Sequence, residues 1–184
     1  MLLIFLFFGL MAGLIRGGKI VNINKNMPEG LWLPILAYTA EILASVDPLF
    51  PGWFLILLEY GMLFWFAGQN RGSGVWPALF FTGSMMNFLV IFHNGFRMPV
   101  SAYIMSIIGN DTVAAALNNH EIFGYTLADE ATKLIFLSDI IAVPLIGDSI
   151  GFASIGDIVL GIGAAILVCK MTLKKENGYD SNTG

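Results

Sequence analysis

Charged residues are scarce in this sequence. They make up 12% of the 184 residues, whereas about 25% is usual in soluble domains. A soluble chain of this length would need a charged surface to cover its core. Apolar residues instead account for 57% of the chain, which is a composition suited to lipid as the solvent. The sequence therefore predicts an all-α integral membrane protein.

Cysteine is nearly absent, and several common motifs are missing. The single cysteine, Cys169, excludes a disulfide within the chain and any zinc site built from several cysteines. The two histidines, His93 and His120, match no dedicated zinc spacing, so no metal site is predicted. The net charge is −4 and there is no basic stripe, which argues against nucleic acid as a partner. There is no P-loop, GxGxxG or GxSxG motif, so neither a cofactor nor a catalytic residue is indicated.

Five apolar runs approach the length of about 20 residues that a membrane-spanning helix requires. They cover residues 1–15, 31–50, 52–68, 75–92 and 154–170. The first run lacks a positively charged start and a small-residue cleavage site, which favours a retained helix over a signal peptide. A sixth run, 134–147, is shorter and contains Asp139 and Pro144, so we expect a re-entrant or interfacial segment. The sequence predicts one transmembrane domain, residues 1–173, followed by a disordered inner tail at 174–184.

The distribution of basic residues predicts how the chain is oriented. With the N-terminus outside, seven basic residues fall on the inner side and two on the outer side. The inner set is Arg16, Lys19, Lys25, Arg71, Lys170, Lys174 and Lys175, and the outer set is Arg97 and Lys133. An excess of lysine and arginine marks the cytoplasmic side. We therefore expect an outer N-terminus and a cytoplasmic C-terminus.

The longest stretch between predicted spans, residues 93–151, is too apolar to be a simple linker and is expected on the outer side. A capping-box pattern from Ser154 to Asp157 predicts the start of the last helix. A similar pattern from Thr126 to Asp129 predicts a short outer helix. We expect the outer stretch to lie against the membrane or to fold over the helices.

The segment His93–Ser101, with the sequence HNGFRMPVS, resembles an uncharacterised family of small bacterial multi-pass membrane proteins, classed as a domain of unknown function. Members carry an N-G-x-x-M-P-V element, matched here at 94–100, and then an acidic-apolar stretch like that at 136–139. The family's final apolar helix opens with S-I-G-D, which is matched at 154–157. The resemblance follows most of the chain in order and spacing. It implies a bacterial cell membrane and no particular activity.

Two acidic residues, Glu41 and Glu59, fall in the middle of the second and third predicted spans. Each is nine residues from the centre of the connecting turn, so in an antiparallel hairpin both lie roughly 13 Å below it. Intramembrane acids are functional-site candidates, and a close pair would share a proton. Alternatively, each glutamate is protonated and bonded to a neighbour such as Tyr38, Tyr60 or Asn87, and so holds the helices together.

A second candidate site is an outer cluster of polar residues: Asn94, Arg97, Asp139 and Asp157. The planar guanidinium of Arg97 suits a carboxylate or phosphate. These residues therefore predict an outward-facing polar pocket for a small or anionic ligand. Alternatively, Arg97 pairs with Asp139 or Asp157 and ties the outer stretch to the helices.

Three classes of function remain open on this sequence. The first is a binding, transport or accessory protein with the outward-facing pocket, in which the two glutamates would form a proton relay for transport. The second is a membrane-embedded enzyme that acts on a lipid or polyprenyl headgroup. The third is a structural subunit with a membrane protein partner. The expected partners are the lipid bilayer and a small anionic molecule or headgroup.

Overall fold

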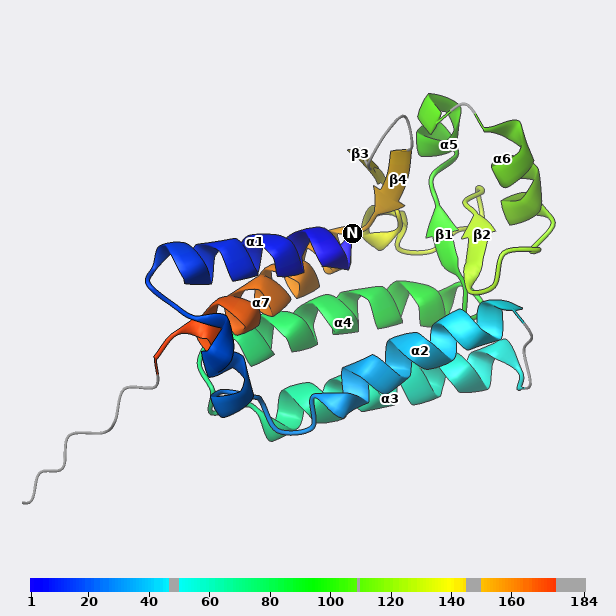
Figure 1. Ribbon diagram of the computed structural model, residues 1–184. Helices are drawn as coiled ribbons and strands as arrows, with labels where there is room; N and C mark the ends of the chain where they lie inside the picture. Colours follow the sequence, from blue (N-terminus) through cyan, green and yellow to red (C-terminus); the bar gives the residue numbers. More distant parts are fainter. Residues whose placement is uncertain (47–49, 109, 145–149, 175–184) are drawn as a thin grey trace, which may run out of the picture.

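The computed structural model describes residues 1–46, 50–108, 110–144 and 150–174. In this part of the chain the backbone is mostly helical, as predicted, and also contains two two-stranded sheets. The longer helices form a bundle, and a smaller unit of short helices and strands stands at one end of it (Figure 1). The bundle helices are α1 (Leu2–Ile15), α2 (Trp32–Val46), α3 (Gly52–Gln69), α4 (Trp76–His93) and α7 (Ile155–Thr172).

Each predicted apolar run coincides with one of these helices to within a few residues, but the helices differ in their capacity to cross a bilayer. Within the described residues, α4 and α7 are 18 residues long and apolar enough to do so. Buried core helices of soluble proteins share that property. Helix α1 and residues Trp32–Leu43 of α2 are apolar but shorter. Helix length and composition thus identify two candidate spans and do not establish five. The predicted tail lies outside the described residues from residue 175 onward.

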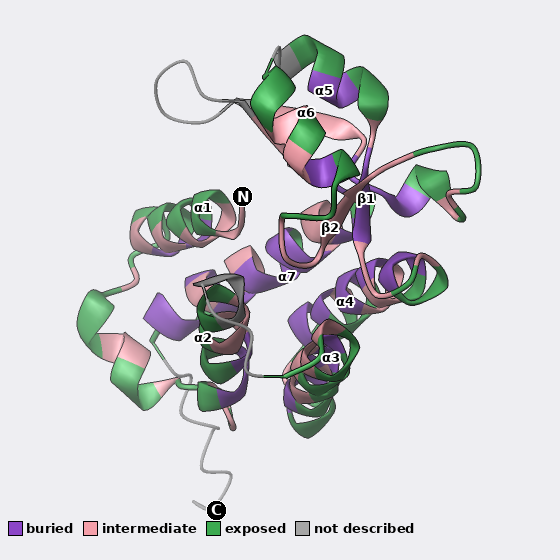
Figure 2. Ribbon diagram, turned by 90° about the vertical axis from the view of Figure 1, so that its right-hand side faces the viewer, coloured by how far each residue is buried: buried purple, intermediate pink, exposed green. Residues whose placement is uncertain are grey.

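Helix α7 is the centre of the bundle. It packs between α1 and α4, while α2 packs against α3 and α3 against α4. Buried residues accordingly concentrate on α4 and α7, and the outer faces of α1 and α3 are exposed (Figure 2). Glycines permit the close approach of these helices. A Cβ atom added at Gly9 of α1 would collide with the backbone of Ala165, and one added at Gly83 of α4 would collide with Gly156 and Leu160.

Both ends of α7 are capped by side chains. At its start, Ser154 Oγ accepts a hydrogen bond from the Asp157 amide and the Asp157 carboxylate accepts one from the Ser154 amide, so the predicted capping box is confirmed. At its end, the caps come from the 3₁₀ helix η1 (Ile20–Lys25) and the residue that follows it. Asn22 donates to the carbonyl oxygen of Thr172 at 2.8 Å, and Asn26 donates to that of Leu173 at 2.6 Å. The chain between α1 and α2 is thereby tied to the end of α7.

Residues 98–108, 110–144 and 150–153, which come from the stretch predicted to lie on the outer side, fold into a small unit at one end of the bundle. We call it the outer unit. Its elements are β1 (Met98–Val100), α5 (Ala102–Ile108), α6 (Asp111–Asn118), β2 (Tyr125–Leu127), η2 (Ile135–Leu137), β3 (Ile141–Pro144) and β4 (Ile150–Ala153). Strands β1 and β2 pair in parallel, with Met98 opposite Tyr125. Strands β3 and β4 pair antiparallel. Helices α5 and α6 supply the crossover that a parallel pair requires.

The predicted short helix starting at Thr126 is wrong. Thr126 belongs to β2 and lies opposite Pro99. The Asp129 carboxylate does not cap a helix but accepts hydrogen bonds from the amide of Ala131 at 3.0 Å and the hydroxyl of Thr132 at 3.1 Å. Aspartate forms such local turns as readily as helix caps. The sequence pattern alone does not distinguish the two outcomes.

The predicted re-entrant or interfacial segment, 134–147, is described as far as residue 144. This part forms the turn η2 and the strand β3. No continuous helix occupies the described portion of the segment. Residues 145–147 lie outside the described residues.

Candidate functional site

A cavity of about 130 Å³ lies where α2, α3, α4 and α7 meet the outer unit. Four acidic residues line it: Glu41 from α2, Glu59 from α3, Asp157 from α7, and Asp139 from the loop between η2 and β3. We call this space the carboxylate cavity. None of the described residues that line it is basic. Both sequence-predicted candidate sites therefore contribute to one cavity.

The two glutamates reach the cavity from neighbouring helices. Helices α2 and α3 pack against each other, and both Glu41 and Glu59 line the cavity between them. Tyr38, one helical turn before Glu41, and Tyr60, next to Glu59, line it as well. The faces of α2 and α3 that carry these glutamates therefore both border the cavity. The two acids share one cavity.

Asn87 connects α4 to the start of α7 inside this cavity. Its amide nitrogen donates to Asp157 Oδ1 at 2.7 Å, and its amide oxygen accepts from Ser154 Oγ at 2.8 Å. Asn87 is buried. Asp157 Oδ2 accepts from the Ser154 amide, so both carboxylate oxygens of Asp157 are hydrogen-bonded. Asp157 is therefore held rigidly, and its charge is compensated by hydrogen-bond donors.

Asp139 has a different environment from Asp157. Its backbone amide donates to Pro99 O and its carbonyl accepts from the Ser101 amide, both at 3.0 Å, which joins it to β1. Its side chain is only 3% exposed, and Oδ1 has no hydrogen-bond partner among the described residues. Burial, reinforced by the negative charge of Asp157, raises the pKa of Asp139 to about 8. Asp139 therefore carries a proton at neutral pH.

Aromatic rings form much of the remaining cavity wall. They belong to Tyr38, Tyr60, Phe123 and Tyr125. Burial, followed by the charge of Asp139, raises the pKa of Tyr125, so its hydroxyl stays neutral. Phe123 and Tyr125 were not identified from the sequence, because they reach the cavity through the pairing of β2 with β1, and that pairing has no local signal.

Asn94 and Arg97 do not line the carboxylate cavity. Asn94 donates to the carbonyl oxygens of Val90 at 2.7 Å and Lys133 at 2.8 Å, and accepts from the Lys133 amide at 2.9 Å. Arg97 donates to the carbonyl oxygens of His120 at 3.5 Å and Tyr125 at 3.4 Å. Both side chains hold loops of the outer unit together. Their ligand-binding role stays a prediction.

The histidines lie in the outer unit or at its border. His93 Nδ1 is 2.8 Å from the Leu89 carbonyl oxygen, and His120 Nδ1 is 3.2 Å from Thr126 Oγ1. Among the described residues, no group of three or more histidine, cysteine, aspartate or glutamate side chains is arranged to hold a metal ion.

The protonation of Asp139 makes stability depend on pH. Its folded-state pKa of about 8 exceeds the unfolded value of about 3.9, so the folded protein retains a proton that the unfolded chain releases. Stability therefore falls as pH rises from about 4 to about 8, by at most about 1.4 kcal/mol per pH unit. We expect Asp139→Asn to remove this dependence, so that the thermal unfolding midpoint changes less between pH 4 and pH 8 than it does in the wild type. Glu130→Gln, at an exposed position, is the control and should leave the pH dependence of the midpoint unchanged. If the midpoint of Asp139→Asn changes with pH as much as that of the wild type, Asp139 is not the residue responsible.

Comparison with known proteins identifies a family but no activity. No curated protein and no solved structure matches the chain. A family model described as "Family of unknown function (DUF5317)" matches residues 26–169. The match covers most of the chain and confirms the family class predicted from the sequence. This protein belongs to the family of unknown function DUF5317.

Proposed function

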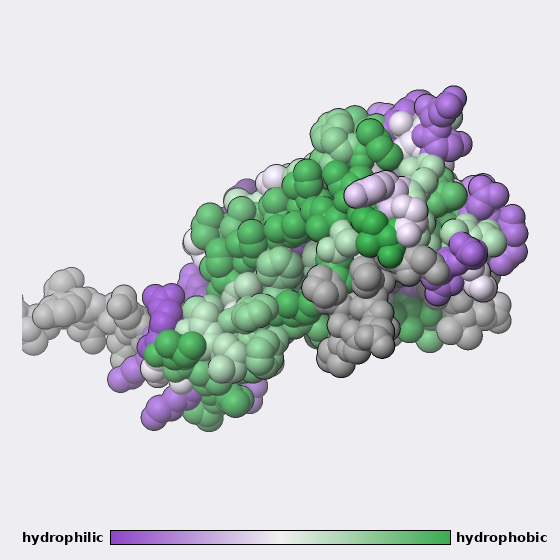
Figure 3. All heavy atoms as spheres, turned by 90° about the horizontal axis from the view of Figure 1, so that it is seen from above, coloured by the Kyte–Doolittle hydropathy of each residue, from purple (hydrophilic) through white to green (hydrophobic). Residues whose placement is uncertain are grey.

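We propose that this chain is a multi-pass protein of the bacterial cell membrane, with α1, α2, α3, α4 and α7 as its five spans. Large apolar side chains on the outer faces of these helices support the proposal. Leu3 is 80% exposed, Phe8 62%, Leu43 64% and Trp65 65%. Figure 3 shows hydrophobic side chains over the middle of the molecule and hydrophilic ones toward its two ends. Soluble monomers rarely expose apolar surface this extensive, whereas a bilayer covers it.

The distribution of basic residues across the fold supports the orientation. One end of the bundle, opposite the outer unit, carries most of them. Those in the described residues there are Arg16, Lys19, Lys25, Arg71, Lys170 and Lys174. Arg97 and Lys133 belong to the outer unit. By the positive-inside rule, the lysine-rich end faces the cytoplasm and the outer unit faces outward. The short helix α1 fits a bilayer if Arg16 extends to the interface.

Within this membrane protein, the carboxylate cavity binds a small organic ammonium ion in competition with protons. The observation that carries this inference is the convergence of four acidic residues on one cavity whose described lining has no basic side chain. Carboxylates attract a cation, and the surrounding tyrosine and phenylalanine rings attract an ammonium group through cation–π interactions. An anion would be repelled, and Arg97, which motivated the anionic ligand, lies outside the cavity.

The size of the cavity limits its ligand. Its volume of about 130 Å³ is below the range of about 300–1,000 Å³ that is typical of pockets for drug-sized molecules. A methylammonium-sized ion suits this space, whereas a polyprenyl or phospholipid headgroup does not. The size therefore favours a binding or transport protein over the enzyme that was the alternative from the sequence. Exchange of the ion for a proton would use the carboxylates that share the cavity.

Titration calorimetry with methylammonium and tetramethylammonium tests this function in detergent-solubilised protein. We expect binding to tighten about tenfold from pH 6 to pH 8, because protons leave the competing carboxyl groups. Glu59→Gln keeps the shape of the side chain but removes its charge, and should weaken binding about tenfold or more. Glu130→Gln, at an exposed position in the outer unit, is the matched control and should bind as wild type does.

Two results would overturn the proposed function. One is binding of acetate in preference to both ammonium ions. The other is ammonium binding that is absent, or that is equal in wild type and Glu59→Gln at every pH.

A further inference from the structure

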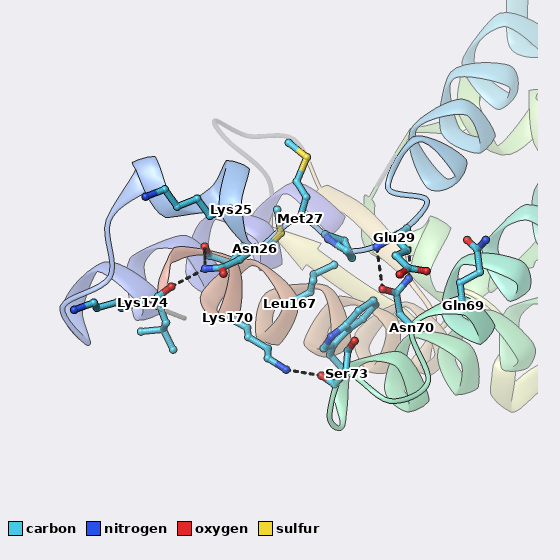
Figure 4. A pocket seen from close by; sticks show the side chains of 14 residues that line it. Lys25, Asn26, Met27, Glu29, Gln69, Asn70, Ser73, Leu167, Lys170 and Lys174 are labelled. Carbon is cyan, nitrogen blue, oxygen red and sulfur yellow. Dashed lines mark hydrogen bonds between the residues drawn. The ribbon is translucent and has the colours of Figure 1, made fainter. Parts of the chain in front are cut away.

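A second cavity lies at the opposite end of the bundle from the carboxylate cavity. Its volume is about 590 Å³, within the usual range for small-molecule sites. The chain between η1 and α2, the ends of α3 and α7, and the start of α4 line it. Three lysines line it: Lys25, Lys170 and Lys174 (Figure 4). We call this space the lysine groove. Its charge is opposite to that of the carboxylate cavity.

Lysines from separate parts of the chain line the groove, with the side chains of Lys25 and Lys174 extending on one side of it and that of Lys170 on the other (Figure 4). Lys25 ends η1, Lys170 lies in the last turn of α7, and Lys174 follows α7. In Figure 4 the Lys170 side chain extends toward Ser73, to whose carbonyl oxygen its ammonium group donates at 2.7 Å. An ammonium group has three N–H donors, so this bond leaves donors on Lys170 for a ligand. Among the described residues, its recorded partner is this neutral carbonyl oxygen and not an acidic side chain.

The negative ends of two helices would oppose an anion in this groove if their carbonyl groups were free. At the end of α7, however, Asn26 donates to the carbonyl oxygens of Met171 and Leu173 at 3.0 and 2.6 Å. At the end of α3, the amides of Asn70 and Arg71 donate to carbonyl oxygens one turn earlier. These caps satisfy the exposed carbonyl groups. These hydrogen bonds reduce the partial negative charge that the two helix ends present to the groove.

One acidic residue, Glu29, also lines the groove. Its backbone, rather than its carboxylate, is bound by the buried Asn70: the Glu29 amide donates to Asn70 Oδ1 at 3.1 Å, and Asn70 Nδ2 donates to the Glu29 carbonyl at 2.8 Å. Glu29 is exposed. Among the described residues that line the groove, three lysines against one glutamate give a positive charge.

We propose that the lysine groove binds a phosphate group. Lysine ammonium groups are strong phosphate ligands, and apolar side chains beside them, such as Met27, Trp76 and Leu167, would contact the organic part of the ligand. The ligand class is therefore an organic phosphate, either a phospholipid headgroup or a free phosphate ester. A lipid source rests on the membrane placement in the proposed function, because basic pockets at the cytoplasmic interface bind anionic headgroups. The phosphate chemistry does not depend on it.

Native mass spectrometry of the full chain, with calorimetry for affinities, tests the proposal. The ligands are phosphatidylglycerol, zwitterionic phosphatidylcholine and glycerol 3-phosphate. We expect wild type to bind phosphatidylglycerol about tenfold or more tightly than phosphatidylcholine, with affinity falling as salt is raised. The double variant Lys25→Gln, Lys170→Gln should lose about tenfold or more of this affinity. Lys133→Gln, which removes one exposed lysine of the outer unit, should change nothing.

The outcomes separate the sources of the phosphate and the two proposals. Tight binding of glycerol 3-phosphate would support a free phosphate ester, and binding of phosphatidylglycerol alone would support a lipid. Equal binding of the two phospholipids without binding of glycerol 3-phosphate, or phosphate affinities unaffected by the double variant, would overturn the proposal. The wild-type selectivity needs no variant, so it remains decisive if the double variant does not fold. Methylammonium binding in the same samples reports separately on the carboxylate cavity.

Discussion

Gly83→Leu is expected to break the packing of α4 on α7 and to lower the thermal unfolding midpoint by about 10 °C or more. A side chain at this position would collide with the backbone of Gly156 and Leu160 in α7. Backbone in a packed interface cannot yield as the end of a side chain can, so the helices must separate. Their separation would also disturb Asn87, one turn further along α4. Circular dichroism and size-exclusion chromatography in detergent measure the loss.

The matched control is Gly61→Leu in α3. A Cβ atom at Gly61 meets nothing within 4 Å, and Gly61 is exposed. The gain in helix propensity is the same in both variants, so the difference between them isolates the collision. The control should remain within a few degrees of wild type. An unfolding midpoint for Gly83→Leu equal to that of Gly61→Leu would show that α4 and α7 do not approach closely at this point.

Asn87→Leu is expected to destabilise the protein by about 2–5 kcal/mol. The substitution removes the donor to Asp157 Oδ1 and the acceptor of the Ser154 hydroxyl. The Asp157 carboxylate would then lose its hydrogen-bond donor from α4. The cost is that of an uncompensated buried group as well as a lost bond. Thermal unfolding in detergent measures it, and Asn118→Leu, at an exposed position, should be close to neutral.

A second substitution separates this electrostatic cost from a simple packing defect. In the Asn87→Leu background, Asp157→Asn removes the uncompensated charge. We expect the double variant to be more stable than the sum of the two single effects predicts, by about 1 kcal/mol or more. Additive effects would mean that Asn87 and Asp157 do not interact, contrary to the 2.7 Å hydrogen bond.

Local features of the fold were predictable from the sequence. Each of the five apolar runs overlaps one helix, because a long apolar run favours helical backbone wherever water is excluded. The start of α7 was predictable to the residue, since the capping box from Ser154 to Asp157 requires only four consecutive residues. The membership in a family of unknown function, which the sequence resemblance predicted, is confirmed by the match over residues 26–169. The pattern at Thr126 failed because a β-strand partner 27 positions away, Pro99, competed with the local helix signal.

The candidate site was predictable only in parts. Glu41 and Glu59 were placed at one depth by counting residues from a turn, and Asp139 and Asp157 were assigned to the outer side by topology. Their convergence on a single cavity could not be derived, because it depends on which faces of α2, α3 and α7 are turned inward. Arg97 was assigned to the same site from its charge alone. Its contacts with the backbone of the outer unit place it outside the cavity lining.

The sequence by itself determined the apolar composition, the approximate positions of the bundle helices and the positions of the basic residues between the apolar runs, since each follows from the chemistry of neighbouring residues. The tertiary structure alone decided that four acidic residues line one cavity and that three lysines line another at the opposite end. Both arrangements bring together residues more than 100 positions apart in the chain. Such contacts arise from helix packing and strand pairing, which leave no local pattern to read.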